Sequence, residues 1–359
     1  MSSEIAQAAR FLIAGLKTGG LDETQVETLV RAVGAAQRGA TAEESRAALL
    51  KLSEGLDLPD LASTEVAARV LGALIEAGHD PQPARGPMLD CLRGVLPLCV
   101  TLADAVRPRI GDPPPGLSEY AAGKWIGRRA NEALERAAQE LPEEARAWQR
   151  LQVVWPGAIA LLSVDPEGRA EASELQPLVH ELLDLHEAAG WLGAMLGVLH
   201  EEPYVAIEPA TGTAIAGRMS GVVENFQLNA LLMDAVPWTG KRRISRNALA
   251  VVRGDGPQQS KETIVATWEL HSYAVLEPDG TLPADPDPET LIWDEGMPAD
   301  IPVVDDHRVI VLCPATSERS WRVQRMFASL PASLTREVLD ADAVAGWLAR
   351  IGEAAAATR

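Results

Sequence analysis

The hydrophobic periodicity of the chain changes near residue 200, and this change constrains the fold more than any other feature of the sequence. Before that point apolar residues recur every three or four positions, as in residues 65–78, which is the spacing of one face of an α-helix. After it, residues 203–221 alternate around Thr211-Gly212, which is typical of a β-hairpin. We therefore expect an α+β protein: an N-terminal all-α helical bundle, then a mixed α/β domain with a largely antiparallel sheet.

The same patterns divide the chain into three segments. Residues 1–150 are predicted to form helices separated by short breakers, one of them opened by a capping box of Thr41 and Glu44. Residues 151–200 contain an acidic turn and then one long amphipathic connecting helix, because leucines recur at alternating steps of four and three. Residues 201–359 are predicted to form the α+β domain. Beyond the hairpin we expect a short helix at 223–237, strands at 247–254, 263–276 and 308–314, and a closing helix from 334 to about 350.

A long acidic segment interrupts the predicted strands. Residues 277–306, which we call the acidic arm, contain ten acidic residues, six prolines and no Lys or Arg. Such a composition disfavours a packed element and predicts an irregular surface loop or extended arm. Trp293 lies inside it, beside Leu291 and Ile292. Either this tryptophan anchors the arm to the domain or it is an exposed recognition element; we favour the anchor, because an exposed tryptophan lowers solubility.

The charge of the chain limits the partners that it can bind. Lys and Arg number 32 and Asp and Glu 51, a net charge of −19, and residues 151–359 alone hold 15 basic and 30 acidic side chains. A field of that sign repels phosphate backbones, so we do not expect nucleic-acid binding.

The cysteines and the apolar runs indicate the compartment. Cys91, Cys99 and Cys313 are odd in number and form no CxxC motif, which argues against a disulfide framework or a zinc site. The N-terminus lacks the long apolar stretch of a signal peptide, and no uncharged run approaches the roughly 20 residues that cross a bilayer. We expect a soluble, cytoplasmic protein without a membrane partner.

Residues 163–174 have the spacing of a calcium-binding EF-hand loop. With Gly168 at the sixth position of the loop, Asp165, Glu167 and Glu174 fall on the third, fifth and twelfth positions, where that loop places oxygen ligands. The first position, however, is a serine, and we find no second loop to pair with this one. Calcium-dependent binding through these three carboxylates is therefore one alternative for the function.

The interpretation that we favour for this segment needs no metal. Asp165, Pro166, Glu167 and Gly168 have the composition of a β-turn, and Ser173 is placed to cap a following helix. On this interpretation the protein needs no cofactor, and Ca²⁺ is kept only as the weaker possibility.

A second alternative is a cysteine-dependent hydrolase or transferase. Cys313 ends the apolar strand predicted at 308–314, a position from which strands often deliver reactive groups, and His271 and His307 are candidate bases. Nothing in the spacing brings these residues together, and a small buried cysteine on a core strand is the commoner case.

The candidate interaction residues are arginines and tryptophans in the C-terminal third. Arg319, Arg322 and Arg325 lie three apart around Trp321, and they share one stripe if the segment is helical. Arg and Trp dominate the energetics of protein interfaces, so these four residues and Trp293 are our predicted recognition set. A charge match with the acidic arm of the same molecule is the alternative role for the arginines. A second basic cluster, KRRISR, covers residues 241–246.

No Walker A or GxGxxG loop occurs in the chain, and no set of catalytic side chains is clustered in the sequence. We therefore predict a protein-interaction protein of the cytoplasm, with a regulatory or accessory role, no catalysis of its own and another protein as its partner.

Overall fold

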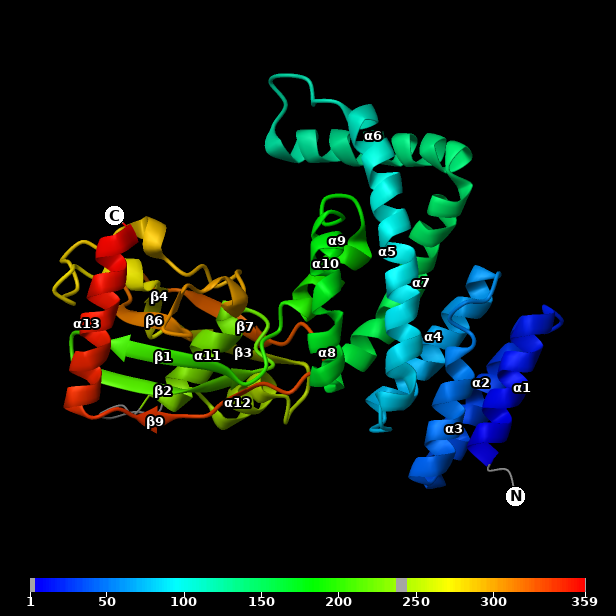
Figure 1. Cartoon of the computed structure of the whole chain (residues 1–359), viewed down its shortest axis with the longest axis horizontal. Coiled ribbons are helices and arrows are strands. Elements are labelled where there is room, and N and C mark those ends of the chain that lie inside the picture. The colour runs from blue at the N-terminus through cyan, green and yellow to red at the C-terminus, as the bar shows by residue number, and fades with distance from the viewer. Residues whose placement is uncertain (1–3, 237–243, 359) are drawn as a thin grey trace. The chain divides into compact units, whose positions relative to one another are not determined.

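The computed structural model describes residues 4–236 and 244–358. The chain forms two compact units, residues 1–196 and 197–359, and Figure 1 shows helices throughout the first and a sheet with flanking helices in the second. The predicted α+β class is confirmed. Residues 241–243 of the second basic cluster lie outside the described residues.

The helical unit begins with short helices and continues with long ones. Thr41 and Glu44 form the predicted capping box: the Thr41 hydroxyl accepts from the Glu44 amide at 3.3 Å, and the Glu44 carboxylate accepts from the Thr41 amide at 2.8 Å. No helix in residues 4–236 or 244–358 combines the length and apolar character that a membrane crossing requires. The helices of the unit are α1 (Glu4–Thr18), α2 (Glu23–Ala36), α3 (Ala42–Ser53), α4 (Leu61–Glu76), α5 (Gln82–Ile110), α6 (Glu119–Glu140), α7 (Pro142–Val164), α8 (Pro166–Ala172), α9 (Gln176–His180) and α10 (Glu187–Leu196), with 3₁₀ turns η1 (Gln37–Gly39) and η2 (Ser173–Leu175).

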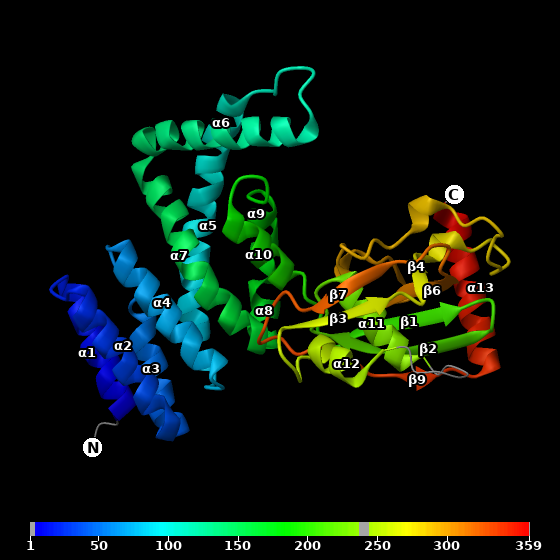
Figure 2. The same ribbon diagram turned by 180° about the vertical axis from the view of Figure 1, so that it is seen from behind.

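The long helix α7 packs against α4 and α5 and forms the centre of this unit. It approaches α4 closely at two glycines, Gly72 and Gly157, whose neighbours leave no room for larger side chains: a Cβ on Gly157 would lie 2.7 Å from the carbonyl oxygen of Ala68. Helix α6 lies across one end of α5 and α7 in both views (Figures 1 and 2). Small residues at the crossing therefore allow the close packing that buries the apolar faces of α4 and α7.

The single connecting helix predicted within residues 151–200 is wrong. After α7 the chain forms α8, η2, α9 and α10, and α10 packs back onto α7 within the helical unit. The leucine pattern is still buried, as at Leu182 and Leu192, but it is divided between short helices. The division has a local cause: His186 immediately precedes α10, and its Nδ1 accepts from the amide of Ala188, in the first turn of that helix, at 3.1 Å.

The second unit is built on a mixed sheet with the strand order β4-β6-β1-β2-β8. Strands β1 and β6 are parallel, and the other pairs are antiparallel. Strand β5 pairs with β6, β9 pairs with β2, and β3 and β7 form a separate two-stranded sheet. The elements are β1 (Glu202–Glu208), β2 (Thr213–Ser220), α11 (Asn225–Ala235), α12 (Arg246–Arg253), β3 (Gln259–Val265), β4 (Trp268–His271), η3 (Tyr273–Val275), η4 (Pro288–Thr290), η5 (Pro298–Asp300), β5 (Val303–Val304), β6 (His307–Pro314), β7 (Ser320–Gln324), β8 (Ser333–Leu334), β9 (Glu337–Val338) and α13 (Ala341–Thr358).

Both faces of the central strands are buried. On β6, Ile310 and Leu312 face a core shared with α11, α12, β3 and β7, whereas Val309, Val311 and Cys313 face a core shared with α13 (Figure 1). A strand that is covered on both sides needs apolar residues at every position, which explains the unbroken apolar run of residues 309–313.

The hairpin and the first strand predicted after it have opposite outcomes. The hairpin around Thr211-Gly212 is confirmed, since β1 and β2 pair from Glu202 with Met219 to Glu208 with Thr213. The strand predicted at 247–254 is wrong: Ser245 caps helix α12 by accepting from the amide of Ala248 at 2.9 Å.

The long strand predicted at 263–276 is also wrong, because the chain divides it between the two sheets. Strand β3 pairs with β7, and β4 pairs with β6. Ala266, between them, donates its amide to the carbonyl oxygen of Arg319 at 2.8 Å, and the chain changes sheet there. The closing helix, expected from 334 to about 350, is α13, and it begins later, at Ala341.

Candidate functional site

The predicted calcium segment, residues 163–174, is helical and does not form a loop. Ser163 belongs to the last turn of α7, and Asp165 caps α8 by accepting from the amide of Gly168 at 3.0 Å. The β-turn predicted at residues 165–168 is also wrong, because these residues form the cap and first turn of α8. Ser173 does not cap a helix as predicted; it donates its hydroxyl to the carbonyl oxygen of Ala170 at 2.7 Å. Pro166 explains the difference: proline is favoured at the first position of a helix that an aspartate caps.

The three carboxylates predicted to bind calcium are directed to two arginines. Asp165 is buried, and its two carboxylate oxygens accept hydrogen bonds from Nε and Nη2 of Arg85 at 2.7 Å each. Glu167 also accepts from Arg85, at 3.0 Å. Glu174 accepts from Arg93 at 2.7 Å. Within the residues that the structure describes, no group of three or more His, Cys, Asp or Glu side chains is arranged to hold a metal ion.

Cys313 is packed in the core between the sheet and α13, with 1 % of its surface exposed. Burial, together with the smaller effect of the neighbouring Glu269 carboxylate, raises the pKa of its thiol to about 12. A thiol with so high a pKa holds almost no thiolate at neutral pH, and the thiolate is the nucleophilic form. The position predicted to deliver a nucleophile therefore holds a core side chain.

The two candidate bases lie in different places relative to this thiol. His307 begins β6 and Cys313 is near its end, so about 20 Å of strand separates them at 3.3 Å per residue. His307 contacts Trp347 edge-on, with ring centroids 5.0 Å apart. His271 lies on the neighbouring strand β4, two positions from Glu269, which is the direct partner of Cys313. Neither histidine has a hydrogen bond to the thiol among the interactions of the described residues.

The acidic arm is irregular, as predicted, and its middle is tied to the domain through the backbone. The amide of Ile292 donates to the carbonyl oxygen of Leu270 on β4 at 2.8 Å, and the amide of Phe226 donates to that of Asp294 at 2.9 Å. Asn225 donates its amide to the carbonyl oxygen of Gly296 at 2.9 Å and its side-chain Nδ2 to that of Trp293 at 2.8 Å. Strand β4 and the start of α11 thus hold residues 292–296 in one conformation.

Trp293 is not the anchor that we predicted, because 62 % of its surface is exposed. The apolar contact with the core is made instead by Ile292, next to it, and the polar contact by the buried Asp294. Neighbouring side chains in an extended segment point in opposite directions. When Ile292 and Asp294 face the domain, the side chain between them is directed to solvent.

The basic cluster around Trp321 lies on strand β7 and its flanks, so the helical stripe is wrong. Arg319 pairs with Asp294 at 2.6 Å and with Glu295 at 2.9 Å, which matches the charge complementarity with the arm. Trp321 is half-buried, its ring centroid 5.2 Å from that of Phe226. Arg322 is exposed.

Arg325 is a structural residue and not a surface one. It is buried, and its guanidinium donates to backbone carbonyl oxygens at Val251, Pro257 and Ala328, the last at 2.9 Å. Burial lowers the pKa of this guanidinium. Of the five predicted recognition residues, Trp293 and Arg322 are exposed, Arg319 and Trp321 are partly buried, and Arg325 is buried.

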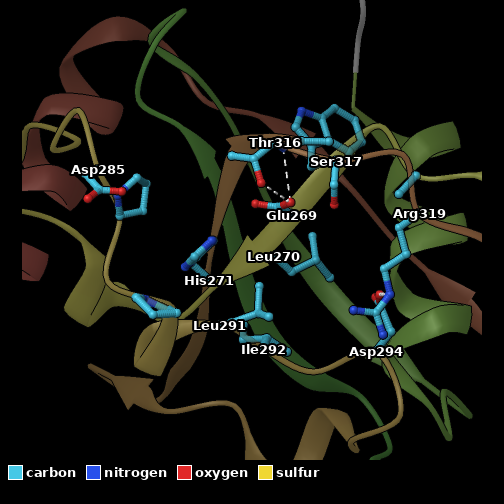
Figure 3. Close-up of a pocket in the computed structure, with 15 residues that line it drawn as sticks. Glu269, Leu270, His271, Asp285, Leu291, Ile292, Asp294, Thr316, Ser317 and Arg319 are labelled. Atoms are coloured by element: carbon cyan, nitrogen blue, oxygen red, sulfur yellow. Dashed lines mark hydrogen bonds and ion pairs between the residues drawn. The ribbon is translucent and has the colours of Figure 1, made fainter.

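A cavity of about 470 Å³ lies between β4, the acidic arm and the loop after β6. Figure 3 shows Glu269 and His271 directed into it from β4, Asp285 from the arm, and the Asp294–Arg319 pair at its other end. Its walls include Leu270, Leu291, Ile292, Pro286 and Pro288.

The hydrogen bonds around His271 determine which ring nitrogen carries the proton. The Thr290 hydroxyl donates to the carbonyl oxygen of Asp287 at 2.6 Å, so its oxygen accepts from Nδ1 of His271, 2.8 Å away. His271 is 3 % exposed, and burial lowers its pKa, which favours the neutral ring. Nε2 then carries no proton and presents a lone pair, and this atom is buried without a hydrogen-bond partner.

Of the polar residues that line this cavity, His271 was predicted for another reason, as a base for Cys313, and Glu269, Asp285 and Asp294 were not predicted. The sequence does contain a signal for Glu269: Glu269 and His271 are polar residues two apart in an apolar strand, so their side chains share one face of the sheet. For Asp285 and Asp294 no local signal exists, because their places depend on how a long arm folds back onto β4.

Comparisons with known proteins found no matching family model, no matching curated protein and no matching solved structure.

Proposed function

We propose that this chain is a protein-interaction protein with a regulatory or accessory role and no catalysis of its own, and that its C-terminal unit recognises the partner through the surface around Trp293. One observation carries the proposal: a tryptophan that is 62 % exposed is borne on a backbone that hydrogen bonds fix on both sides.

The fixed backbone makes this exposed side chain suited to binding. Ile292, Trp293, Asp294 and Gly296 each have a backbone group bonded to β4 or to the start of α11. A side chain held in this way loses little conformational freedom when a partner covers it. Tryptophan buries a large apolar area and is enriched among the residues that dominate interface energetics. Exposure that would otherwise lower solubility is therefore consistent with a role in recognition.

The charges around Trp293 indicate the chemistry of the partner. The acidic arm holds no Lys or Arg, and Arg319, which contacts the two residues that follow Trp293, is already paired with Asp294 and Glu295. A surface of this composition attracts a protein with a basic face and a small apolar depression for the indole. The exposed acidic side chains of the arm are Asp279, Asp285, Asp287, Glu289, Glu295, Asp300, Asp305 and Asp306.

A capture experiment with matched variants tests this function. The full-length chain is immobilised and exposed to lysate of its own source, in parallel with Trp293→Ala and with Tyr120→Ala. Tyr120 is the control, because it is an aromatic residue 73 % exposed on α6 in the other unit. We expect a stoichiometric partner that Trp293→Ala loses and Tyr120→Ala retains. We also expect added salt to weaken its retention, because screening reduces the attraction between opposite charges. A partner retained equally by all three proteins would contradict the proposed surface.

A further inference from the structure

The cavity beside β4 contains a hydrogen-bond acceptor that the protein leaves unused. Nε2 of His271 is buried in a side chain 3 % exposed, has no partner, and lines the cavity. Desolvating an acceptor without a partner is unfavourable, and most buried polar groups in folded proteins are paired. The contrast within the chain is direct: His186 is equally buried, yet one of its ring nitrogens contacts the Trp148 carbonyl oxygen at 3.1 Å and the other accepts from an amide.

Two carboxylates at this end of the cavity are acceptors too. One oxygen of Glu269 accepts from the amide and hydroxyl of Thr316, at 3.1 and 2.8 Å, and the carboxylate is only half-buried. Asp285 presents an exposed carboxylate from the arm (Figure 3). The one arginine of the lining, Arg319, is neutralised by Asp294 and Glu295. The lining therefore carries uncompensated negative charge and offers lone pairs to a donor.

We propose that this cavity binds an organic cation, a primary ammonium or guanidinium group on a short apolar stem, which donates hydrogen bonds to Nε2 of His271 and to the carboxylates of Glu269 and Asp285.

The apolar walls and the size of the cavity fit the stem of such a ligand. Leu270, Leu291 and Ile292 line the side nearest β4, and Pro286 lies beside Asp285. A volume of about 470 Å³ falls in the lower part of the range for small-molecule sites, in which a few polar groups orient a ligand held mainly by apolar contact. An anion would meet the two carboxylates and the histidine lone pair, all of which repel it.

Calorimetric titration of the full-length protein tests the proposal. The probes are n-butylammonium and n-butylguanidinium, and the matched comparators are 1-butanol and butyrate, which have the same stem with a neutral or a negative head. We expect saturable binding of the two cations and none of the comparators.

Two variants and a control locate the site. Glu269→Gln removes one charge but keeps an oxygen that can accept from Thr316, and Asp285→Asn changes an exposed side chain that folding does not require. Each should weaken cation binding at least about tenfold, the effect of losing one charge-assisted hydrogen bond. Glu337→Gln, an equal charge change at an exposed position on β9, should have no effect. Circular dichroism confirms that each variant is folded.

Nuclear magnetic resonance reports on the histidine itself. With ¹⁵N-labelled histidine, the Nε2 resonance of His271, identified by its absence in His271→Asn, should shift when the cation binds, because a free lone pair becomes a hydrogen-bond acceptor. An unchanged resonance at saturation would overturn the role given to His271.

The last comparison separates the two sources of such a cation. Acetyl-Gly-Lys-Gly-amide carries the ammonium on a protein-like side chain, whereas n-butylammonium is a free molecule; stronger binding of the peptide assigns the cavity to a side chain of another protein, and stronger binding of the free amine to a small molecule. Trp293→Ala should bind either probe as the unmodified protein does. The proposal for this cavity and the proposal for the recognition surface are therefore tested independently. Absence of saturable binding by every cation, or undiminished binding by Glu269→Gln and Asp285→Asn, would overturn the proposal.

Discussion

Replacing Arg319 with alanine should loosen the part of the acidic arm that carries Trp293. The guanidinium Nε lies 2.6 Å from a carboxylate oxygen of Asp294, whose side chain is 8 % exposed, whereas that of Arg319 is 33 % exposed. Truncating one partner of a fully buried pair costs about 3–5 kcal/mol, because the other charge stays buried alone, and an exposed pair contributes at most about 1 kcal/mol. Because Arg319 is partly exposed, we expect a loss of about 2–3 kcal/mol.

The response of Asp294 limits this loss. Burial raises the pKa of its carboxyl group, and Arg319 opposes that shift. Without the arginine the pKa rises further, and a carboxyl group that takes up a proton no longer bears a buried charge. The double variant Arg319→Ala with Asp294→Asn should therefore be more stable than Arg319→Ala alone, because the amide removes the charge at the outset.

Hydrogen exchange measured by mass spectrometry reports the loss of local stability in the part of the arm that Arg319 holds. The amide of Phe226 donates to Asp294 and that of Ile292 donates to Leu270, so their exchange reports on the attachment of the arm. A loss of 2–3 kcal/mol accelerates exchange through opening of this region by roughly 30- to 150-fold. The control is Arg322→Ala, an exposed arginine of the same segment, for which we expect about a twofold change or less. Equal exchange rates in the two single variants would refute the reasoning.

Three further results are expected. Cys313 should resist iodoacetamide in the native protein at pH 8 and react in denaturant, because burial raises its pKa to about 12; rapid native labelling would revive the cysteine-dependent alternative. The free energy of unfolding should fall as the pH is lowered below about 6.5, by up to about 1.4 kcal/mol per pH unit for each of His186 and His271. Burial lowers the pKa of both, so the unfolded chain takes up protons that the native state excludes, and urea titrations from pH 7 to pH 5 that show no loss would contradict this. Asp165→Ala should destabilise the helical unit by about 3 kcal/mol, because it leaves Arg85 without its bidentate partner and removes the cap of α8, whereas millimolar calcium should leave the melting temperature unchanged.

The features that the sequence predicted correctly depend on short-range interactions. The capping box at Thr41 joins residues three apart, and the hairpin at Thr211-Gly212 needs only a turn and two alternating strands. The α+β class follows from the change of periodicity, which is also a local signal. The apolar run of β6 predicted a buried strand for the same reason.

The wrong predictions arose where a competing local or distant interaction decides the structure. Residues 247–254 have the composition of a strand, but the Ser245 cap and apolar residues at helical spacing form α12 instead. Pro166 and Asp165 turn a calcium-like spacing into the start of a helix. The spacing of residue types therefore does not identify a calcium-binding loop when the same residues can also form the N-terminal cap of a helix.

The candidate site was only partly accessible to sequence reasoning. The exposure of Trp293 follows from Asn225 and Phe226, which hold the arm from almost 70 positions away, and nothing in the local sequence indicates those bonds. The free Nε2 of His271 depends on the hydroxyl of Thr290 and the carbonyl oxygen of Asp287, both in the arm. Interactions at such separation in the chain are set by the folded arm as a whole.

Photo-crosslinking at position 293 tests the recognition surface most directly. Photoreactive benzoylphenylalanine is placed at residue 293 in one protein and at residue 120 in another, and each is irradiated in lysate of its own source. Both positions are exposed aromatic sites in the native chain. We predict one predominant adduct with a partner protein from residue 293 and no corresponding adduct from residue 120. The same weak set of adducts from both positions would contradict a recognition surface at Trp293.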